Sequence, residues 1–260
     1  MKIVICFFGI TRNLKDFTLD SIERCLLGPV AEQDPTYKKF GHFNLVHHIF
    51  NPRSGEDNIP VDPNEFRLLN CDRVSHTDQN RLDAQLDYDG IQEFGDCQGD
   101  DFCSLNNLVR QLYSLNQVTD ILLHADEQFD LAIYSRADIR FEKKVAIPKI
   151  RPGTVYTPWF DKYRGLNDRF AMGDVATMIK YGQRYSMIRQ YCEETGHPLH
   201  AERFLLWYSK KQRFRNVDLT SIDFCRVRAN GKAVLVDTSP RARLKYRLKK
   251  ALHILRVRSY

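Results

Sequence analysis

Short apolar runs alternate with longer stretches of helical periodicity along this 260-residue chain, and that alternation limits the fold more than any other feature. Apolar runs at Lys2–Phe8, Phe43–Asn51 and Phe129–Tyr134 predict buried strands. Between the last two, leucines recur every three or four residues from Leu105, which predicts a helix that leads into the third run. Strands that alternate with helices are typical of an α/β domain with a mostly parallel sheet flanked by helices.

The remaining pattern extends this domain to residue 239. A first helix is expected over Phe17–Cys25, and residues 52–104 are expected to form an irregular polar insertion. A helix with Asp174 as its N-cap and Gly196 as its terminator follows, and then a helix over 200–212. Further strands are expected at 153–159, 169–173 and 214–219, and a hairpin around Asn230-Gly231.

The net charge of +6 belongs to the end of the chain. Residues 241–258 contain eight Lys or Arg and no acid, so subtracting these eight from +6 leaves the rest of the chain at −2. Leu244, Leu248 and Leu255 lie on one side of a helix drawn over this segment. The pattern predicts a C-terminal basic amphipathic helix, with residues 240–260 as a tail on a domain that covers 1–239.

The composition is that of an ordinary globular domain. Seven cysteines are scattered without zinc-like or redox spacing, which favours a reducing, cytoplasmic compartment. The apolar start, Ile3–Ile10, has neither a basic leader nor a small-residue cleavage site, and is interpreted as a strand rather than a signal peptide. No stretch reaches the roughly 18–20 apolar residues of a membrane span.

Polar side chains gather where three predicted strands end, which is where ligands bind in open α/β sheets. Gly9, Thr11 and Arg12 follow the first strand, Arg136 and Asp138 end the strand "DLAIYSRADIRF", and Asn167 and Asp168 precede a short strand. Arginine suits a diphosphate, and an aspartate at a strand end suits a divalent cation. Taken singly, each group also fits a turn, a helix cap or a solvated surface charge.

His200 and Glu202 begin the predicted helix at 200–212. His200 is a candidate metal ligand, although it equally fits a simple helix start. Glu202 is a candidate acid or base, because the apolar sequence after it directs the start of the helix toward the expected pocket; a glutamate in the first turn also suits the helix dipole.

The segments "GITRN", "RQLYSLNQV", "DLAIYSRADIRF", "NDRFAMG" and "HAERFLL" together resemble bacterial and large-virus glycosyltransferases of the GT-A fold. The resemblance covers about residues 2–215 apart from the insertion. It implies a Rossmann-like GT-A domain that binds a nucleotide-sugar, with a UDP-sugar the expected donor, and transfers the sugar to a glycan or lipid-linked saccharide in surface polysaccharide biosynthesis.

The resemblance also assigns roles to individual residues. Asp138 takes the place of the second aspartate of an Asp-x-Asp motif that holds Mn²⁺ or Mg²⁺, and Arg136 replaces the first, which puts the need for metal in question. The expected donor site comprises Gly9, Thr11, Arg12, Arg136, Asp138 and Asn167, with His200 as a second metal ligand. In an inverting reaction Asp168 is the first choice for the base and Glu202 the second; in a retaining reaction Asp168 holds the donor sugar instead.

The basic tail fits an anionic membrane surface, which predicts a peripheral protein at the inner face of the membrane. A solvated helix packed on its own domain is the simpler interpretation of the same residues. Two other functions remain open: a nucleic-acid-associated protein that uses the tail, and a catalytically silent glycan-binding protein on the same fold. The net acidic body and the lack of a nucleic-acid motif argue against the first, so no nucleic-acid partner is expected.

Overall fold

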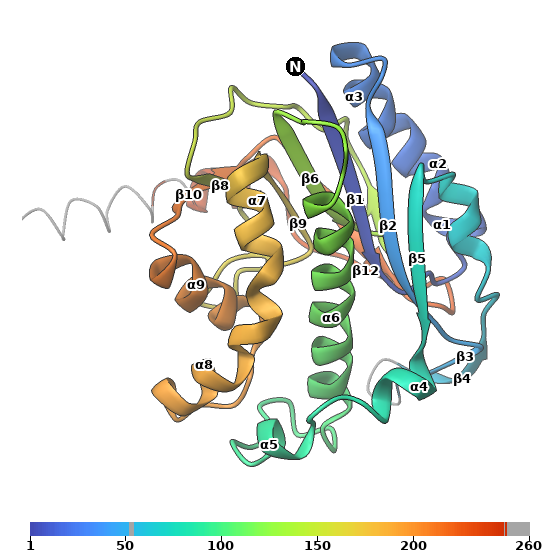
Figure 1. Ribbon diagram of the computed structural model, residues 1–260, viewed down its shortest axis with the longest axis vertical. Helices are drawn as coiled ribbons and strands as arrows, with labels where there is room; N and C mark the ends of the chain where they lie inside the picture. Colours follow the sequence, from blue (N-terminus) through green and yellow to red (C-terminus); the bar gives the residue numbers. More distant parts are fainter. Residues whose placement is uncertain (52–54, 247, 249–260) are drawn as a thin grey trace, which may run out of the picture.

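The computed structural model describes residues 1–51, 55–246 and 248 of the chain. A seven-stranded sheet forms its centre (Figure 1), in the order β10 (Arg215–Leu219), β8 (Thr154–Pro158), β9 (Phe170–Asp174), β6 (Leu131–Arg136), β1 (Ile3–Gly9), β2 (Lys38–Leu45) and β5 (Arg73–Asp78). β9 runs antiparallel to both of its neighbours, and all other neighbouring strands are parallel. The expected α/β domain with a mostly parallel sheet is therefore confirmed.

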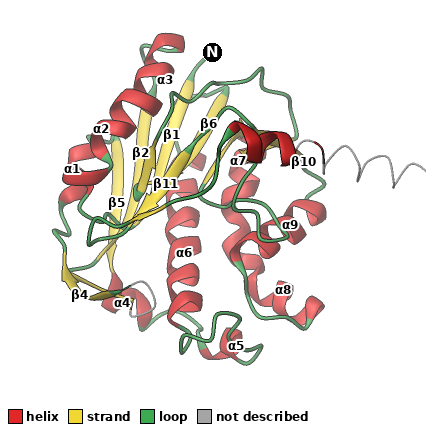
Figure 2. Cartoon of the chain, turned by 180° about the vertical axis from the view of Figure 1, so that it is seen from behind, coloured by secondary structure: helices red, strands yellow, loops and turns green. Residues whose placement is uncertain are grey.

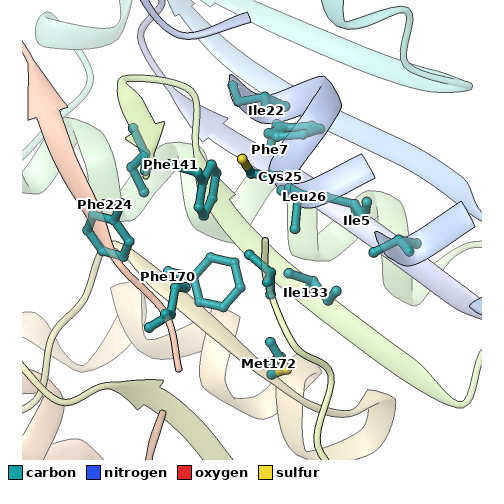
Figure 3. Close-up of a cluster of buried hydrophobic side chains, with 14 of the residues drawn as sticks. Ile5, Phe7, Ile22, Cys25, Leu26, Ile133, Phe141, Phe170, Met172 and Phe224 are labelled. Atoms are coloured by element: carbon teal, nitrogen blue, oxygen red, sulfur yellow. The ribbon is translucent and has the colours of Figure 1, made fainter. Parts of the chain in front are cut away.

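The alternation of side chains along β1 explains the two apolar layers of the domain. Ile3, Ile5 and Phe7 lie on one face, in a cluster shared with the helical segment after β1 (Figure 3). That segment comprises α1 (Leu14–Phe17), α2 (Leu19–Ile22), the π-helical turn η1 (Glu23–Leu27) and α3 (Gly28–Gln33). It extends further in both directions than the helix expected over Phe17–Cys25.

The other face of the sheet is covered by the later helices, which lie in front of it in Figure 1. Val4, Cys6 and Phe8 of β1 share a cluster with leucines of α6 (Cys103–Leu123). α7 (Val175–Gly182), the 3-10 turn η4 (Gln183–Met187), α8 (Ile188–Thr195) and α9 (Ala201–Lys211) complete this layer. The single helix expected between Asp174 and Gly196 is divided by the 3-10 turn, but its two ends are confirmed. Asp174 accepts a hydrogen bond from the Thr177 amide at 3.0 Å, and Gly196 ends α8 in the left-handed region.

The segment expected to be an irregular insertion contains regular structure over about half of its described part, and the prediction is wrong there. Its elements are β4 (Glu56–Pro60), the 3-10 turn η3 (Glu65–Leu69), β5, α4 (Gln79–Asp83) and α5 (Asp89–Gln92). β5 joins the central sheet at its edge, where a strand needs few apolar side chains, and Val74 is accordingly exposed. The strand expected over Phe43–Asn51 divides into β2 and β3 (His48–Asn51), which pairs with β4.

A second sheet brings the end of the domain to the carboxyl ends of β1 and β6. It consists of β12 (Ala233–Val234), β11 (Phe224–Val227) and β7 (Ile139–Phe141), and β11 is visible across the central sheet in Figure 2. The hairpin expected around Asn230-Gly231 is thus confirmed. Because β7 follows β6 after only two residues, its antiparallel pairing with β11 places Arg226 opposite Ile139 and beside Asp138.

The first part of the expected C-terminal helix is docked on the domain. Residues 240–246 are helical, Tyr246 packs against Trp159 at 5.2 Å between ring centroids, and Arg243 pairs with Asp223. Leu244 and Leu248 are 59% and 57% exposed. The rest of the predicted amphipathic helix lies outside the described residues. No helix within the described ranges has the length and hydropathy needed to cross a membrane.

Candidate functional site

A cavity of about 740 Å³ lies at the carboxyl ends of β1 and β6. The chain builds the sheet outward from β1 in one direction through β2 and β5, and in the other direction from β6. Neighbouring strands whose connections leave in opposite directions separate at their carboxyl ends, and ligands of open α/β sheets bind there. Gly9 from β1 and Arg136 from β6 both line the cavity, as the sequence predicted.

Gly9 gives the first wall of the cavity its shape. Its φ of 101° is accessible to glycine but strained for other residues. The Gly9 amide donates to Ser114 Oγ at 2.8 Å, and that hydroxyl donates to the His42 carbonyl at 2.7 Å. α6, β1 and β2 are thereby joined at one buried point, and the loop that carries Arg12 leaves the sheet in a fixed direction.

The Arg136–Asp138 pair explains why the β6 strand ends on Arg-x-Asp. Arg136 donates through two nitrogens to both carboxylate oxygens of Asp138, one at 2.7 Å between Nε and Oδ1. Arg12 approaches the same carboxylate at 3.7 Å, and Asp138 is 3% exposed. Although burial opposes it, the charges of Arg136 and Arg12 hold the pKa of Asp138 well below its usual range. Asp138 is therefore an ionised support beneath the cavity rather than part of its lining.

A second buried carboxylate, Glu56 of β4, is the other partner of Arg12. Its oxygens lie 3.5 Å from a nitrogen of Arg12 and 3.4 Å from one of Arg228, and accept a hydrogen bond from the Ala229 amide at 2.7 Å. The side chain is fully buried. Glu56 thereby connects the β3–β4 hairpin, the loop after β1 and the β11–β12 hairpin.

The lining of the cavity is strongly cationic. Among the described residues of the lining, two carboxylates, Asp168 and Glu202, accompany seven basic side chains: Arg12, Arg110, Arg136, Arg169, Arg226, Arg228 and Lys232. Arg110 is neutralised by Asp83 at 2.7 Å, but several of the others have nitrogens without a hydrogen-bond partner among the described residues. Such a lining favours a polyanionic ligand, and arginine in particular favours phosphate oxygens.

The side chains present do not fit the expected divalent cation. Mn²⁺ and Mg²⁺ require carboxylate oxygens that are free to coordinate, and both oxygens of Asp138 are occupied by guanidinium groups. His200 lies with Glu202 and not with a set of oxygen ligands. Among the residues that the structure describes, no group of three or more His, Cys, Asp or Glu side chains is placed to hold one ion. The roles expected of Asp138 and His200 as metal ligands therefore find no support here.

Glu202 stands at the first turn of α9 and faces the cavity. Its carboxylate lies 3.3 Å from Arg169 and 3.2 Å from Nδ1 of His200. Burial, followed by the negative charge of Asp168, raises the pKa of Glu202 to about 7. The backbone of Glu202 packs directly against Gly165. A Cβ added to Gly165 would lie only 1.8 Å from the Glu202 carbonyl oxygen, so a glycine is needed there. A carboxyl group with this pKa exchanges protons readily near neutral pH.

The pKa of Asp168 is shifted in the direction opposite to that of Glu202. Gln111 donates to its Oδ2 at 2.7 Å and also accepts from Arg136, so that Asp168 is connected to the Arg136–Asp138 pair. Although burial opposes it, the charges of Arg169, Arg136 and Arg184 lower the pKa of Asp168. Two neighbouring carboxylates with pKa values moved in opposite directions are typical of acid and base assignments in active sites.

Most residues singled out from the sequence meet in this cavity. Its lining contains the predicted Gly9, Arg12, Arg136, Asp168, His200 and Glu202. Thr11 and Asn167 are buried outside the lining. Asn167 donates to the Phe160 carbonyl and accepts from the Arg169 amide, which makes it a turn residue.

Three lining residues, Gln111, Arg226 and Arg228, were not predicted from the sequence, and Arg169 was recognised there only as part of the polar cluster with Asn167 and Asp168. Arg226 and Arg228 are two residues apart on β11 and its extension, and therefore face the same side. That spacing within "FCRVRANG" was the available signal.

No protein-family model and no curated protein sequence matches this chain. Its function is accordingly inferred from the chemistry of the site.

Replacing Asp138 by Asn is expected to destabilise the protein by about 3 kcal/mol, because it leaves Arg136 buried beside Arg12 without its carboxylate. Urea denaturation of the purified variant measures this loss. Asp20→Asn is the matched control. Asp20 of α2 pairs with Arg24 of η1, and both side chains are exposed. An exposed ion pair contributes about 0–1 kcal/mol. Equal stability of the Asp138 variant and the wild type would contradict the supporting role of this carboxylate.

Glu202→Gln is expected to change the pH dependence of stability. A carboxyl whose folded pKa is raised from about 4.5 to about 7 stabilises the fold below pH 4.5, and that contribution is lost as the pH rises through 7. Since glutamine does not titrate, the melting temperature of the variant should rise relative to wild type between pH 5 and pH 8. Thermal melts across this range test it, with Glu193→Gln, an exposed glutamate of α8, as the control. A pH-independent difference would show that Glu202 titrates normally.

Proposed function

We propose that this chain is a glycosyltransferase that moves a sugar from a nucleotide-sugar donor to a glycan or lipid-linked saccharide acceptor. The observation that carries the proposal is the combination, in one cavity, of an arginine-rich lining and a single carboxyl group with a pKa near 7. The first suits the diphosphate of a nucleotide-sugar, and the second suits removal of a proton from an acceptor hydroxyl.

The bonds formed and broken can be assigned to these groups. The bond between the anomeric carbon of the donor sugar and the diphosphate oxygen breaks, and its electron pair leaves with the nucleoside diphosphate. The acceptor oxygen attacks the anomeric carbon and gives its proton to the Glu202 carboxylate. Arginines around the diphosphate stabilise the negative charge of the leaving group. General-base assistance of this kind typically contributes about 10²–10⁴-fold.

The directions of the two pKa shifts favour Glu202 over Asp168 as the base, the reverse of the order preferred from sequence. A base must accept a proton, and the low pKa of Asp168 makes it the poorer acceptor. Its permanent charge suits instead a hydrogen bond to a donor hydroxyl or stabilisation of positive charge on the sugar ring. Asp168 is suited to that positioning role whether the anomeric configuration is inverted or retained.

The fold is compatible with the proposal. A mostly parallel sheet with a ligand cavity where its strand order diverges is shared by many nucleotide-binding α/β proteins, and the GT-A type is the one that the motifs of this chain resemble. UDP-sugars remain the preferred donors by that resemblance. A catalytically silent glycan-binding protein would not require a carboxyl group with a raised pKa beside a cationic lining.

A donor screen tests the proposal. The purified chain is incubated with UDP-, GDP-, CMP- and dTDP-linked sugars, and both the melting temperature and the release of free nucleotide are measured. Sugars linked to one of the four nucleotides are expected to raise the melting temperature of the protein. The same nucleotide-sugars should be hydrolysed slowly, because water can take the place of the acceptor. Glu202→Gln should keep the thermal shift but lose at least about 100-fold in nucleotide release, whereas Glu193→Gln should behave as wild type.

The absence of any shift with all four nucleotide classes would contradict the glycosyltransferase proposal. Tighter binding of RNA than of any nucleotide-sugar would instead favour a nucleic-acid-associated protein.

We further propose that the basic segment 241–258 attaches the protein to an anionic membrane at its inner, cytoplasmic face. Leu244 and Leu248 support this, because both are exposed on the same segment in which Ala242 and Tyr246 pack against the domain. Tyr246 donates to Asp218 and lies beside Lys162, whose Nζ is 2.7 Å from that aspartate. The described part of the helix is thus held on the domain with two leucines directed outward.

The double variant Leu244→Ser/Leu248→Ser is expected to bind anionic vesicles more weakly without losing thermal stability, since neither leucine is buried. Cosedimentation with phosphatidylglycerol vesicles measures binding, and phosphatidylcholine vesicles show the contribution of charge. Leu235→Ser removes a leucine that is 79% exposed outside the basic segment and serves as the control. Unchanged sedimentation of the double variant, or equal binding to both lipids, would refute the membrane proposal.

A further inference from the structure

Arg226 is a partly buried cation among other cations. Its Nε has no hydrogen-bond partner among the described residues, and the ion pairs of that part of the chain do not include it. Burial, and then the like charges of Arg169, Arg136 and Arg228, lower the pKa of Arg226 to about 9, against the one favourable influence of Asp138. An arginine held in such surroundings is stabilised when an anion enters between the guanidinium groups.

The charges around Arg226 are divided between two levels. Arg12, Arg136, Arg226 and Arg228 all line the cavity, whereas Asp138 and Glu56, the carboxylates that pair with three of them, lie beneath it. These four guanidinium groups and two carboxylates carry a net charge of +2 as a set. The two negative charges of a diphosphate would relieve the repulsion among the four cations.

These cations also supply the hydrogen-bond donors that such a ligand needs. All three of Arg12, Arg226 and Arg228 line the cavity, and the buried Nε atom of each makes no hydrogen bond among the described residues, although Arg12 Nε lies 3.7 Å from Asp138. Arg136 differs, because its guanidinium is already occupied by Asp138 and Gln111. The other three arginines come from the loop after β1 and from β11 with its extension. Arg12 and Arg228 meet at the same oxygen of Glu56, so a diphosphate bound there would be contacted from both segments.

We propose that the diphosphate site of this protein is built from arginine side chains alone, with Arg12, Arg226 and Arg228 in the place that a divalent cation takes in a metal-dependent site. Asp138 and Glu56, which would otherwise be available to a metal, hold these arginines in position. The ligand class is a diphosphate ester or pyrophosphate. Its identification with a nucleotide-sugar rests on the proposed function, whereas the metal-free binding of phosphate does not.

Binding measurements with a chelator present test this directly. Isothermal titration of the full chain with inorganic pyrophosphate, and separately with UDP, is carried out in EDTA and again with Mn²⁺. The affinity in EDTA is expected to equal that with Mn²⁺ within about twofold for UDP, and to fall as salt is added, since screening weakens charge attraction.

Variants at β11 distinguish a ligand-binding arginine from a structural one. Arg226→Ala should weaken pyrophosphate binding by about 10–100-fold, as expected when hydrogen bonds to a charged ligand are lost. Its melting temperature without ligand should be unchanged or higher, because a like charge has been removed. Arg226→Lys should recover only part of the affinity, since it lacks the planar fork. Arg215→Ala, at an exposed position of β10, is the control.

The outcomes separate this inference from the proposed function. Binding of UDP only in the presence of Mn²⁺, or wild-type affinity in Arg226→Ala, would overturn the arginine site and leave the glycosyltransferase proposal standing. Metal-free binding of pyrophosphate without binding of any nucleotide or nucleotide-sugar would support the arginine site and contradict the donor assignment. Failure to bind pyrophosphate or UDP under either condition would overturn the inference.

Discussion

Two buried carboxylates allow this domain to hold several arginines in one cavity. Without Asp138 and Glu56, the largely buried guanidinium groups of Arg12, Arg136 and Arg228 would repel one another with little screening by solvent. Each carboxylate also joins parts of the chain that are far apart in sequence. Buried ion pairs rarely add much to stability when compared with apolar packing. Their presence here is better explained by the cationic surface that they hold in place.

The elements that depend on local signals could be predicted from the sequence. β1 and β6 are nearly continuous apolar runs, α6 has a regular leucine spacing, and Asp174 and Gly196 mark the limits of α7 and α8 through side-chain and backbone preferences that act over a few residues. The same reasoning placed Gly9, Arg12 and Arg136 at one edge of the sheet. Once a parallel sheet is inferred, residues that end its strands are neighbours whatever their separation in the chain.

The features that depend on tertiary partners could not be predicted. β5 carries almost no apolar side chains, and only its pairing with β2 makes it a strand. Asp138 has the position of a metal ligand in the sequence, but the arginines around it decide its chemistry. Arg226 and Arg228 belong to the site only because β11 pairs with β7. The preference for Glu202 over Asp168 follows from buried charges that no spacing pattern contains.

The pairing of β11 with β7 has a consequence for the order in which the protein acquires its active form. The ribosome releases β1, β6 and β7 well before β11, so the central sheet can begin to assemble on a nascent chain that still lacks Arg226 and Arg228. In the proposed arginine site, affinity for polyphosphates would arise only once Arg226 and Arg228 have been synthesised. A chain that stops after β10 would contain all seven strands of the central sheet without these two arginines.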